Sequence, residues 1–303
     1  MAMFERLRAQ FQDAQYLYIV PLIAALLPWA LARRWLVFWA QRTSGPYEES
    51  AQTAAVIAPD YMDVGDLRAF RSNVRLIWLL DAYDLFLSVT RWRRCWWPDH
   101  IEQVGAWPES GAFIATSFHH GTGLWTFKSL TKSGRDSLLI YGRWAREDYL
   151  GRPLLYRYGR WRAREVQRLS GQPVAYRPGV RERVARSLAD GISVVGVIDM
   201  PPRLATRGQR PVRLLDRDIS FPNGVLDLAQ NANVPIIPYW VEFDLARCTR
   251  RLCIGAPLDP ADTSGTLQAL ADILDRQIRA TPSAWYFWRE LPEWIAAAAK
   301  ARE

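Results

Sequence analysis

The chain has 303 residues, half of them apolar, and a formal net charge of +8, so it can bury a full core as one large domain or two small ones. Cys95, Cys248 and Cys253 are too few and too irregularly spaced for a disulfide framework or a zinc site. We therefore expect no metal ion and a reducing, cytosol-facing environment.

All but three of the 39 basic residues are arginines. A guanidinium group binds phosphate in a bidentate fork, but codon usage in a GC-rich genome produces the same bias, so both explanations stay open. No nucleic-acid partner is expected, because the chain has no recognisable motif of that class and begins with an apolar segment.

The amino-terminal segment is uncharged over residues 16–32 and is followed by two arginines and several aromatic residues. A run of 17 residues is at the lower limit for spanning a hydrocarbon core of about 30 Å. Pro21 and Pro28 also weaken a straight helix, so a tilted or half-inserted membrane anchor is predicted over residues 1–42. The flanking tryptophans and arginines are residue types that settle at lipid headgroups. The alternative is a buried core helix.

The chain is then polar to about residue 75, and residues 70–90 are strongly apolar at helical spacing. Trp92, Trp96 and Trp97 follow, interleaved with arginines, and form either a second interfacial patch or a packed aromatic corner.

Residues 43–303 are predicted to form a single domain, in which strand and helix patterns alternate from residue 111 onward. Apolar runs typical of buried strands occupy residues 111–117, 136–141, 192–198 and 234–241. A last helix over about Thr266–Ala280 places an apolar stripe on one face. This alternation predicts an α/β fold with a central, mostly parallel sheet flanked by helices, joined to the N-terminal membrane-anchoring helix.

The first of these strands ends in His119-His120-Gly121-Thr122-Gly123, directly before a helical segment. A histidine at the start of a helix places a general base beside free backbone N–H groups, which suits acyl transfer. His119 is the predicted base, and His120 points the other way if the pleat persists, where it contacts an acceptor or fills space. The backbone N–H groups around Gly121 and Gly123 are predicted to stabilise an oxyanion.

The strand over residues 192–198 ends at Asp199. Neighbouring parallel strands deliver their carboxyl ends to one crevice, so Asp199 is predicted to orient the imidazole of His119. Its alternative role is to cap the proline-rich turn that follows it. The chain has no G-x-S-x-G element, so no serine nucleophile and no covalent enzyme intermediate are expected.

The order of these features resembles the lysophospholipid and lipid A late acyltransferase family (lauroyl/myristoyl acyltransferase-like) over nearly the whole chain. The resemblance rests on the uncharged amino-terminal helix, a strand ending in His-x-Gly, a strand ending in Asp about 80 residues later, and a specific carboxy-terminal segment. In that segment the family's Ile-Arg-x-x-Pro and Trp-x-x-Trp positions hold Ile278, Arg279, Pro282, Trp285 and Trp288.

The resemblance implies transfer of a fatty acyl group from acyl carrier protein or acyl-CoA to a hydroxyl or amine of a lipid A-like or lysolipid-like acceptor. It implies no cofactor beyond that donor, and a location at the cytoplasmic face of the inner membrane of a Gram-negative bacterium. Arg143 and Arg164 lie where the family binds the acceptor's phosphate. The family's H-x-x-x-x-D/E motif is broken by Leu124, so the alternative is a non-catalytic descendant that binds an acyl chain or lipid. The oligomeric state is not predicted.

Overall fold

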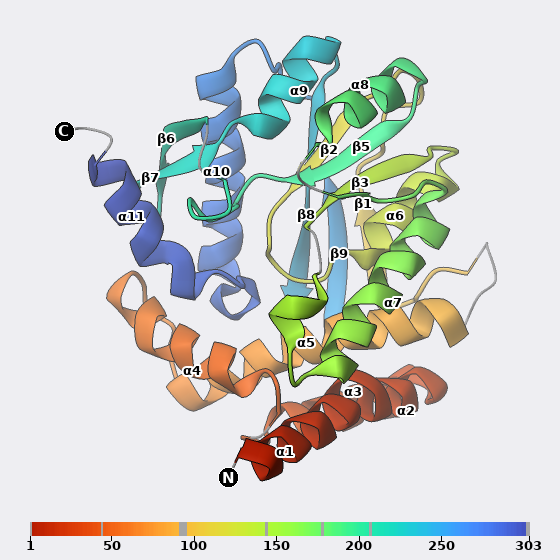
Figure 1. The fold of residues 1–303 in the computed structure, drawn as a ribbon, viewed down its shortest axis with the longest axis vertical. Coiled ribbons are helices and arrows are strands. Elements are labelled where there is room, and N and C mark those ends of the chain that lie inside the picture. Colours follow the sequence, from red (N-terminus) through yellow and green to blue (C-terminus); the bar gives the residue numbers. More distant parts are fainter. Residues whose placement is uncertain are drawn as a thin grey trace.

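A central seven-stranded sheet organises the computed structural model, which describes residues 2–43, 45–90, 96–142, 145–176, 179–205 and 208–300 (Figure 1). In spatial order the strands are β1 (Ile101–Val104), β9 (Thr249–Ile254), β8 (Ile236–Asp244), β2 (Ile114–Ser117), β5 (Ser193–Val197), β3 (Ser137–Tyr141) and β4 (Ala175–Tyr176). The β8–β9 pair is antiparallel and the other pairs are parallel. The predicted α/β fold with a mostly parallel sheet is confirmed, and its four predicted strands are β2, β3, β5 and β8.

Helices cover both faces of this sheet. They are α6 (Leu124–Lys132), α7 (Pro153–Ser170), α8 (Arg181–Ala189), α9 (Gly224–Ala232), α10 (Thr263–Ala280) and α11 (Leu291–Lys300). A separate antiparallel hairpin pairs β6 (Gln209–Leu214) with β7 (Arg217–Pro222) and packs on α10 and α11. Short 3-10 helices lie at Ala58–Asp60, Arg146–Tyr149, Pro282–Ala284 and Trp288–Glu290.

The strand pleat divides the apolar residues between two cores. Phe113 and Ala115 of the β2 segment pack with α6, α7 and the amino-terminal helices, whereas Ile114 between them packs with α8 to α11. Successive strand residues point to opposite faces, and both faces of the sheet centre are covered, so β2 and β5 are almost wholly buried. The predicted apolar stripe of the last helix is part of the second core, where Leu267, Leu270, Ala271, Leu274 and Ile278 are fully buried.

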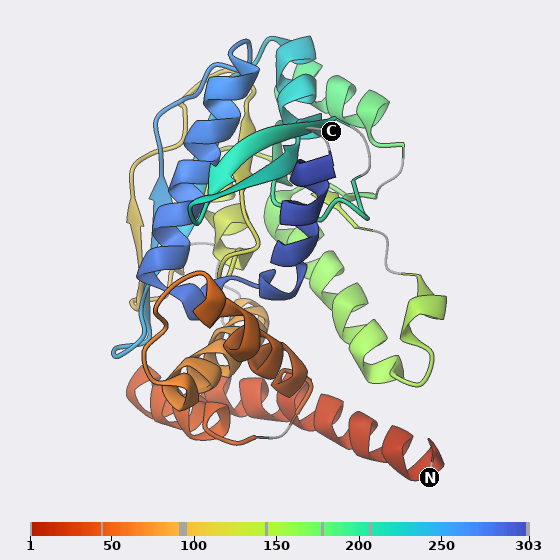
Figure 2. The same cartoon turned by 90° about the vertical axis from the view of Figure 1, so that its left-hand side faces the viewer.

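Five amino-terminal helices form a layer at one end of the molecule, the lower end in Figure 1. They are α1 (Ala2–Ala14), α2 (Val20–Leu26), α3 (Trp29–Ala40), α4 (Glu48–Ile57) and α5 (Leu67–Thr90), with a π-helical turn at Gln15–Ile19 between the first two. Figure 2 shows the same layer from the side, with α1 reaching toward α7.

The two prolines predicted to weaken the amino-terminal helix lie at its irregular points. Pro21 has no N–H to donate, and the turn before it widens so that the Val20 N–H bonds the Gln15 carbonyl. The helix ends at Leu26, Leu27 is extended, and Pro28 precedes α3. Within the described ranges, we find no helix with the length and apolar content that a bilayer crossing requires.

The amino-terminal helices are neither wholly buried nor wholly exposed. Tyr16, Leu17, Val20, Ala24 and Ala25 face the core and are almost inaccessible to solvent. The opposite face of α1, the π turn, α2 and α3 leaves a set of large apolar side chains exposed, which we call the N-terminal apolar face: Phe4, Leu7, Phe11, Ile19, Leu22, Ile23, Leu26, Leu31 and Phe38. The inner face of this segment therefore belongs to the core, as in the core-helix alternative, and the membrane anchor stays a prediction.

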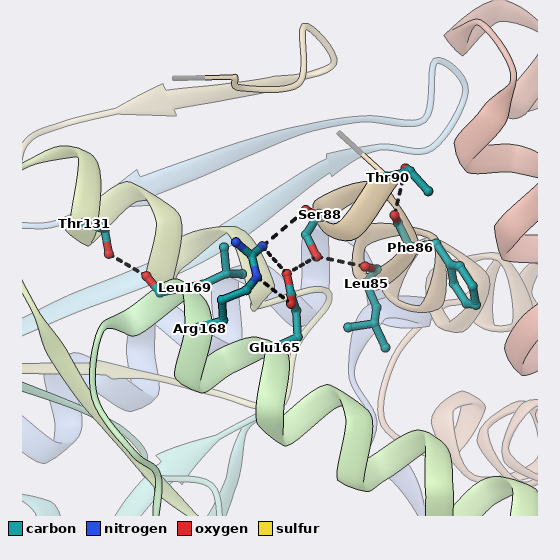
Figure 3. Close-up of polar contacts among 8 residues, drawn as sticks. All are labelled: Leu85, Phe86, Ser88, Thr90, Thr131, Glu165, Arg168 and Leu169. Carbon is teal, nitrogen blue, oxygen red and sulfur yellow. Dashed lines mark hydrogen bonds and ion pairs between the residues drawn. The ribbon is translucent and has the colours of Figure 1, made fainter. Parts of the chain in front are cut away.

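Hydrogen bonds join the inner side of α7 to α5 and α6 (Figure 3). The Ser88 hydroxyl at the end of α5 donates to Glu165 Oε1 at 2.7 Å, and the Arg168 guanidinium bonds the Glu165 carboxylate and the Ser88 carbonyl. The Thr131 hydroxyl of α6 donates to the Leu169 carbonyl at 2.6 Å. These bonds fix which face of α7 points outward.

Of the tryptophans expected between α5 and the sheet, Trp96 and Trp97 pack edge-on against Trp125 of α6. They form the packed aromatic corner, whereas Trp92 lies outside the described residues.

Candidate active site

His119 and Asp199 meet at the carboxyl edge of the sheet, because β2 and β5 are adjacent parallel strands. The Nδ1 atom of His119 lies 2.9 Å from Oδ1 of Asp199. The backbone N–H of His119 also donates to both carboxylate oxygens, at 3.0 and 2.8 Å. Within the described residues, none of the carboxylate's hydrogen bonds reaches the Met200–Pro202 turn that Asp199 could have capped. The structure thus brings together the two side chains that the sequence placed 80 positions apart.

The Asp199 carboxylate is fully buried, while the His119 side chain is 33% exposed. An ionised carboxylate only accepts hydrogen bonds, so Nδ1 of His119 is the donor in this contact. Phe287 packs against the imidazole with ring centroids 4.4 Å apart. The imidazole is thus held in one orientation through Nδ1, which leaves Nε2 as the ring nitrogen that could act as a general base.

Trp285 is a third partner of this pair that the sequence argument did not assign to the site. Its indole Nε1–H donates to Oδ2 of Asp199 at 3.3 Å. The resemblance drew attention to Trp285, but nothing in a sequence shows that residues 199 and 285 meet.

His120 points away from His119 and is buried. Its Nε2 lies 3.2 Å from the Thr281 carbonyl, which can only accept, so Nε2 carries the proton. Burial lowers the pKa of His120 to about 4, so it is neutral at pH 7. His120 is 5% exposed, which fits the space-filling alternative, and its contact with an acceptor stays a prediction.

Residues 118–123 join β2 to α6 and form what we call the histidine loop. Its two glycines differ in whether the backbone N–H is already hydrogen-bonded. The Gly121 N–H donates to the Ala284 carbonyl at 2.8 Å, so it is not free for an oxyanion as expected. Gly121 has φ +73°, and a Cβ there would lie 2.2 Å from the Phe243 ring, so only glycine fits. Gly123 immediately precedes α6, where the first backbone N–H groups have no acceptor within the helix.

Among solved structures, one similar chain is the 1-acyl-sn-glycerophosphate (LPA) acyltransferase PlsC from Thermotoga maritima. The alignment covers 93% of this chain and 98% of that chain, with 15% identity and a TM-score of 0.34. No protein-family model and no curated protein matches the sequence. A structural similarity of this extent assigns no activity, so we infer the function from the residues of this chain.

The structure describes one of the two arginines expected to bind an acceptor phosphate. Arg143 lies outside the described residues. Arg164 is exposed on the outer side of α7. Arg162 of the same helix faces inward and forms a bidentate pair with Asp81 of α5 at 2.5 and 2.9 Å.

A second buried ion pair is hydrogen-bonded to the histidine loop. Arg250 of β9 and Asp84 of α5 pair at almost complete burial. The same guanidinium Nη1 donates to the Thr122 hydroxyl at 3.0 Å. This link joins the amino-terminal helices to the loop between His120 and α6.

In the part of the chain that the structure describes, no group of three or more His, Cys, Asp or Glu residues could hold a metal ion.

Proposed function

We propose that this protein is a membrane-associated acyltransferase, which moves a fatty acyl group from a thioester to a hydroxyl or amine of an amphipathic, lipid A-like or lysolipid-like acceptor. One observation carries the proposal: the His119 imidazole is held by the buried Asp199 carboxylate through Nδ1, while the side chain is open to solvent. This is the arrangement of a general base whose orienting acid is permanently shielded.

The proposed reaction uses one proton shuttle. Nε2 of His119 takes the proton of the acceptor hydroxyl as its oxygen attacks the thioester carbonyl carbon, and the buried carboxylate stabilises the imidazolium that forms. The C–S bond of the tetrahedral intermediate then breaks, and the departing sulfur takes the proton from His119. Backbone N–H groups at the start of α6, beginning near Gly123, are the proposed donors to the oxyanion. No enzyme-bound acyl intermediate is needed.

The N-terminal apolar face supports a membrane location. Its exposed side chains include Phe4, Leu7 and Phe11 on α1, and Arg6 and Arg8 are exposed beside them. Apolar side chains flanked by arginine are typical of helices that lie in the headgroup region of an anionic bilayer. We propose that this face docks on the cytoplasmic side of a bacterial inner membrane and brings the acceptor to the site.

The outer side of α7 supports an acidic donor. Arg157, Arg160 and Arg164 follow one another at helical spacing and are exposed, and none of them has an ion-pair partner among the described residues. The acid on this helix, Glu165, is buried and paired with Arg168. A basic strip of this kind attracts an acidic acyl carrier protein or the phosphates of coenzyme A.

The alternative function is a non-catalytic protein that binds an acyl chain or lipid. Leu124 favours it, because this buried leucine occupies the position of the family's motif acid. The His119–Asp199 contact favours the enzyme, since a lipid-binding pocket does not require an oriented imidazole.

The experiment compares lipids from cells that express the wild type, His119→Ala and Asp199→Asn at matched membrane levels, by mass spectrometry. Asp190→Asn, which changes an exposed acid at the end of α8, is the matched control. Loss of one acylated species in both site variants but not in the control supports the enzyme and identifies the acceptor. If wild type and His119→Ala produce the same lipids, the enzyme proposal fails and the lipid-binding alternative takes its place.

The donor is tested with the purified protein. Arg160→Glu/Arg164→Glu should raise KM for an acyl carrier protein donor at least tenfold, with a smaller effect on acyl-CoA, whose three phosphates span less of the strip. Arg181→Glu, on α8, reverses one exposed charge elsewhere and serves as the control. An unchanged KM for both donors would show that the α7 strip is not the donor site.

A further inference from the structure

Two backbone hydrogen bonds join the carboxy-terminal segment, residues 281–288, to the histidine loop. The Gly121 N–H donates to the Ala284 carbonyl at 2.8 Å, and the Tyr286 N–H donates to the His119 carbonyl at 3.0 Å. These two bonds form an antiparallel bridge between His120 and Trp285. Tyr286 in turn stacks on Trp78 of α5, with ring centroids 4.2 Å apart. The loop and the segment are therefore joined to each other and to α5.

Trp285 reaches the catalytic pair from within this bridge. Asp199 Oδ1 accepts from the His119 imidazole at 2.9 Å, whereas the indole N–H of Trp285 occupies Oδ2 at 3.3 Å. The two side-chain donors therefore divide the carboxylate oxygens between them. A buried carboxylate needs hydrogen bonds to both oxygens to stay ionised in one orientation.

The indole has little freedom to turn away. Trp285 is 1% exposed and stacks on Trp294 with ring centroids 5.8 Å apart and an interplanar angle of 11°. Trp288 also packs against Trp285, edge to face, with ring centroids 5.1 Å apart. Trp294 is itself tied to the turn after Asp199, because its indole N–H donates to the Met200 carbonyl at 3.3 Å.

We propose that Trp285 is a positioning residue: its indole N–H holds the Asp199 carboxylate with Oδ1 toward His119, and so keeps the imidazole proton on Nδ1. Its catalytic consequence rests on the proposed function, but its structural consequence does not. Without the indole N–H, Oδ2 has only the shared backbone N–H of His119, and the carboxylate can rotate away from the imidazole.

The test variant is Trp285→Phe, which keeps an aromatic ring in the cluster and removes the N–H. Trp288→Phe is a matched control, because Trp288 is also 1% exposed in the same cluster and its N–H donates to the Pro282 carbonyl at 2.8 Å. The first readout is NMR of the ¹⁵N-labelled imidazoles. The chain has three histidines, and His100, which stacks on Trp29, serves as an internal reference.

Trp285→Phe should shift the His119 Nδ1–H signal and increase its exchange with water, with His100 unchanged. Trp288→Phe should alter neither. The second readout is acyl transfer: Trp285→Phe should lower kcat about 10- to 100-fold at unchanged KM, as loss of a hydrogen bond to a charged group does. The acidic limb of its pH–rate profile should move to lower pH, because a rotated carboxylate stabilises the imidazolium less.

Equal His119 spectra in the two phenylalanine variants would overturn the positioning role. The NMR readout needs no turnover, so an inactive wild type with the expected spectra would refute the proposed function alone. If Trp285→Phe does not fold, the Trp285 Nε1–H signal of ¹⁵N-labelled protein is compared between wild type and Asp199→Asn. That signal should shift while the Trp288 signal does not, and an unshifted Trp285 signal would also overturn the proposal.

Discussion

The buried second histidine should make the stability of the fold depend on pH in a defined window. Burial lowers the pKa of His120 from an ordinary value of 6.5 to about 4. Between these values the unfolded chain binds a proton that the folded chain does not, so the stabilisation is complete above about pH 6.5 and is lost as the pH falls toward 4. A pKa lower by about 2.5 in the folded state corresponds to a change in the free energy of unfolding of about 3 kcal/mol in total, of which about 2 kcal/mol is lost between pH 7 and 5.

The assay is urea unfolding followed by tryptophan fluorescence from pH 7.5 to 4.5, for the wild type and His120→Gln. The glutamine amide can still donate to the Thr281 carbonyl but does not titrate. Carboxylates titrate in both proteins, so the difference between the two stability curves isolates His120. The stability of the wild type should fall by about 2 kcal/mol more than that of the variant between pH 7 and 5. Parallel curves would refute the argument that His120 is buried as a neutral donor.

Three further predictions concern other parts of the structure. Gly121→Ala should destabilise the protein by at least about 1–3 kcal/mol in thermal denaturation, because its φ is +73° and the new Cβ would clash with Phe243; a neutral substitution would contradict the loop geometry. Arg250→Met should cost about 3–5 kcal/mol in urea unfolding by leaving Asp84 buried and unpaired, and adding Asp84→Asn should recover much of that loss; additive losses would show that the pair is not coupled. Phe11→Ser should leave unfolding unchanged but weaken flotation with anionic vesicles several-fold, because Phe11 is 68% exposed; equal flotation would argue against docking through the N-terminal apolar face.

The sequence predicts the centre of the sheet better than its edges. The strands β2 and β5 are buried on both faces, so they stand out as apolar runs. The edge strand β1 has one buried residue followed by three exposed ones, and β4 has two residues, so neither differs from a loop in the sequence. The β6–β7 hairpin was also not predicted, since several of its residues are exposed and charged.

The site was predictable to the extent that topology decides it. Adjacent parallel strands end at the same edge, and this was enough to associate His119 with Asp199. The partners that come from other layers were not predictable. Arg250 pairs with Asp84 across 166 positions, and Trp285 reaches Asp199 across 86, through packing that no local pattern encodes. For the same reason, sequence spacing did not distinguish the exposed Arg164 from the inward-facing Arg162.

The bridge between the histidine loop and the carboxy-terminal segment also bears on how the protein is made. His120 meets Thr281 across 161 positions, and His119, Asp199 and Trp285 are likewise joined by contacts of long sequence separation. Such contacts close large loops and form late in folding. A chain emerging from the ribosome has exposed its amino-terminal apolar helices long before residues 281–288 leave the exit tunnel. Under the proposed function, the nascent protein would reach a lipid surface before its site is complete, which would confine acyl transfer to molecules that are already in place.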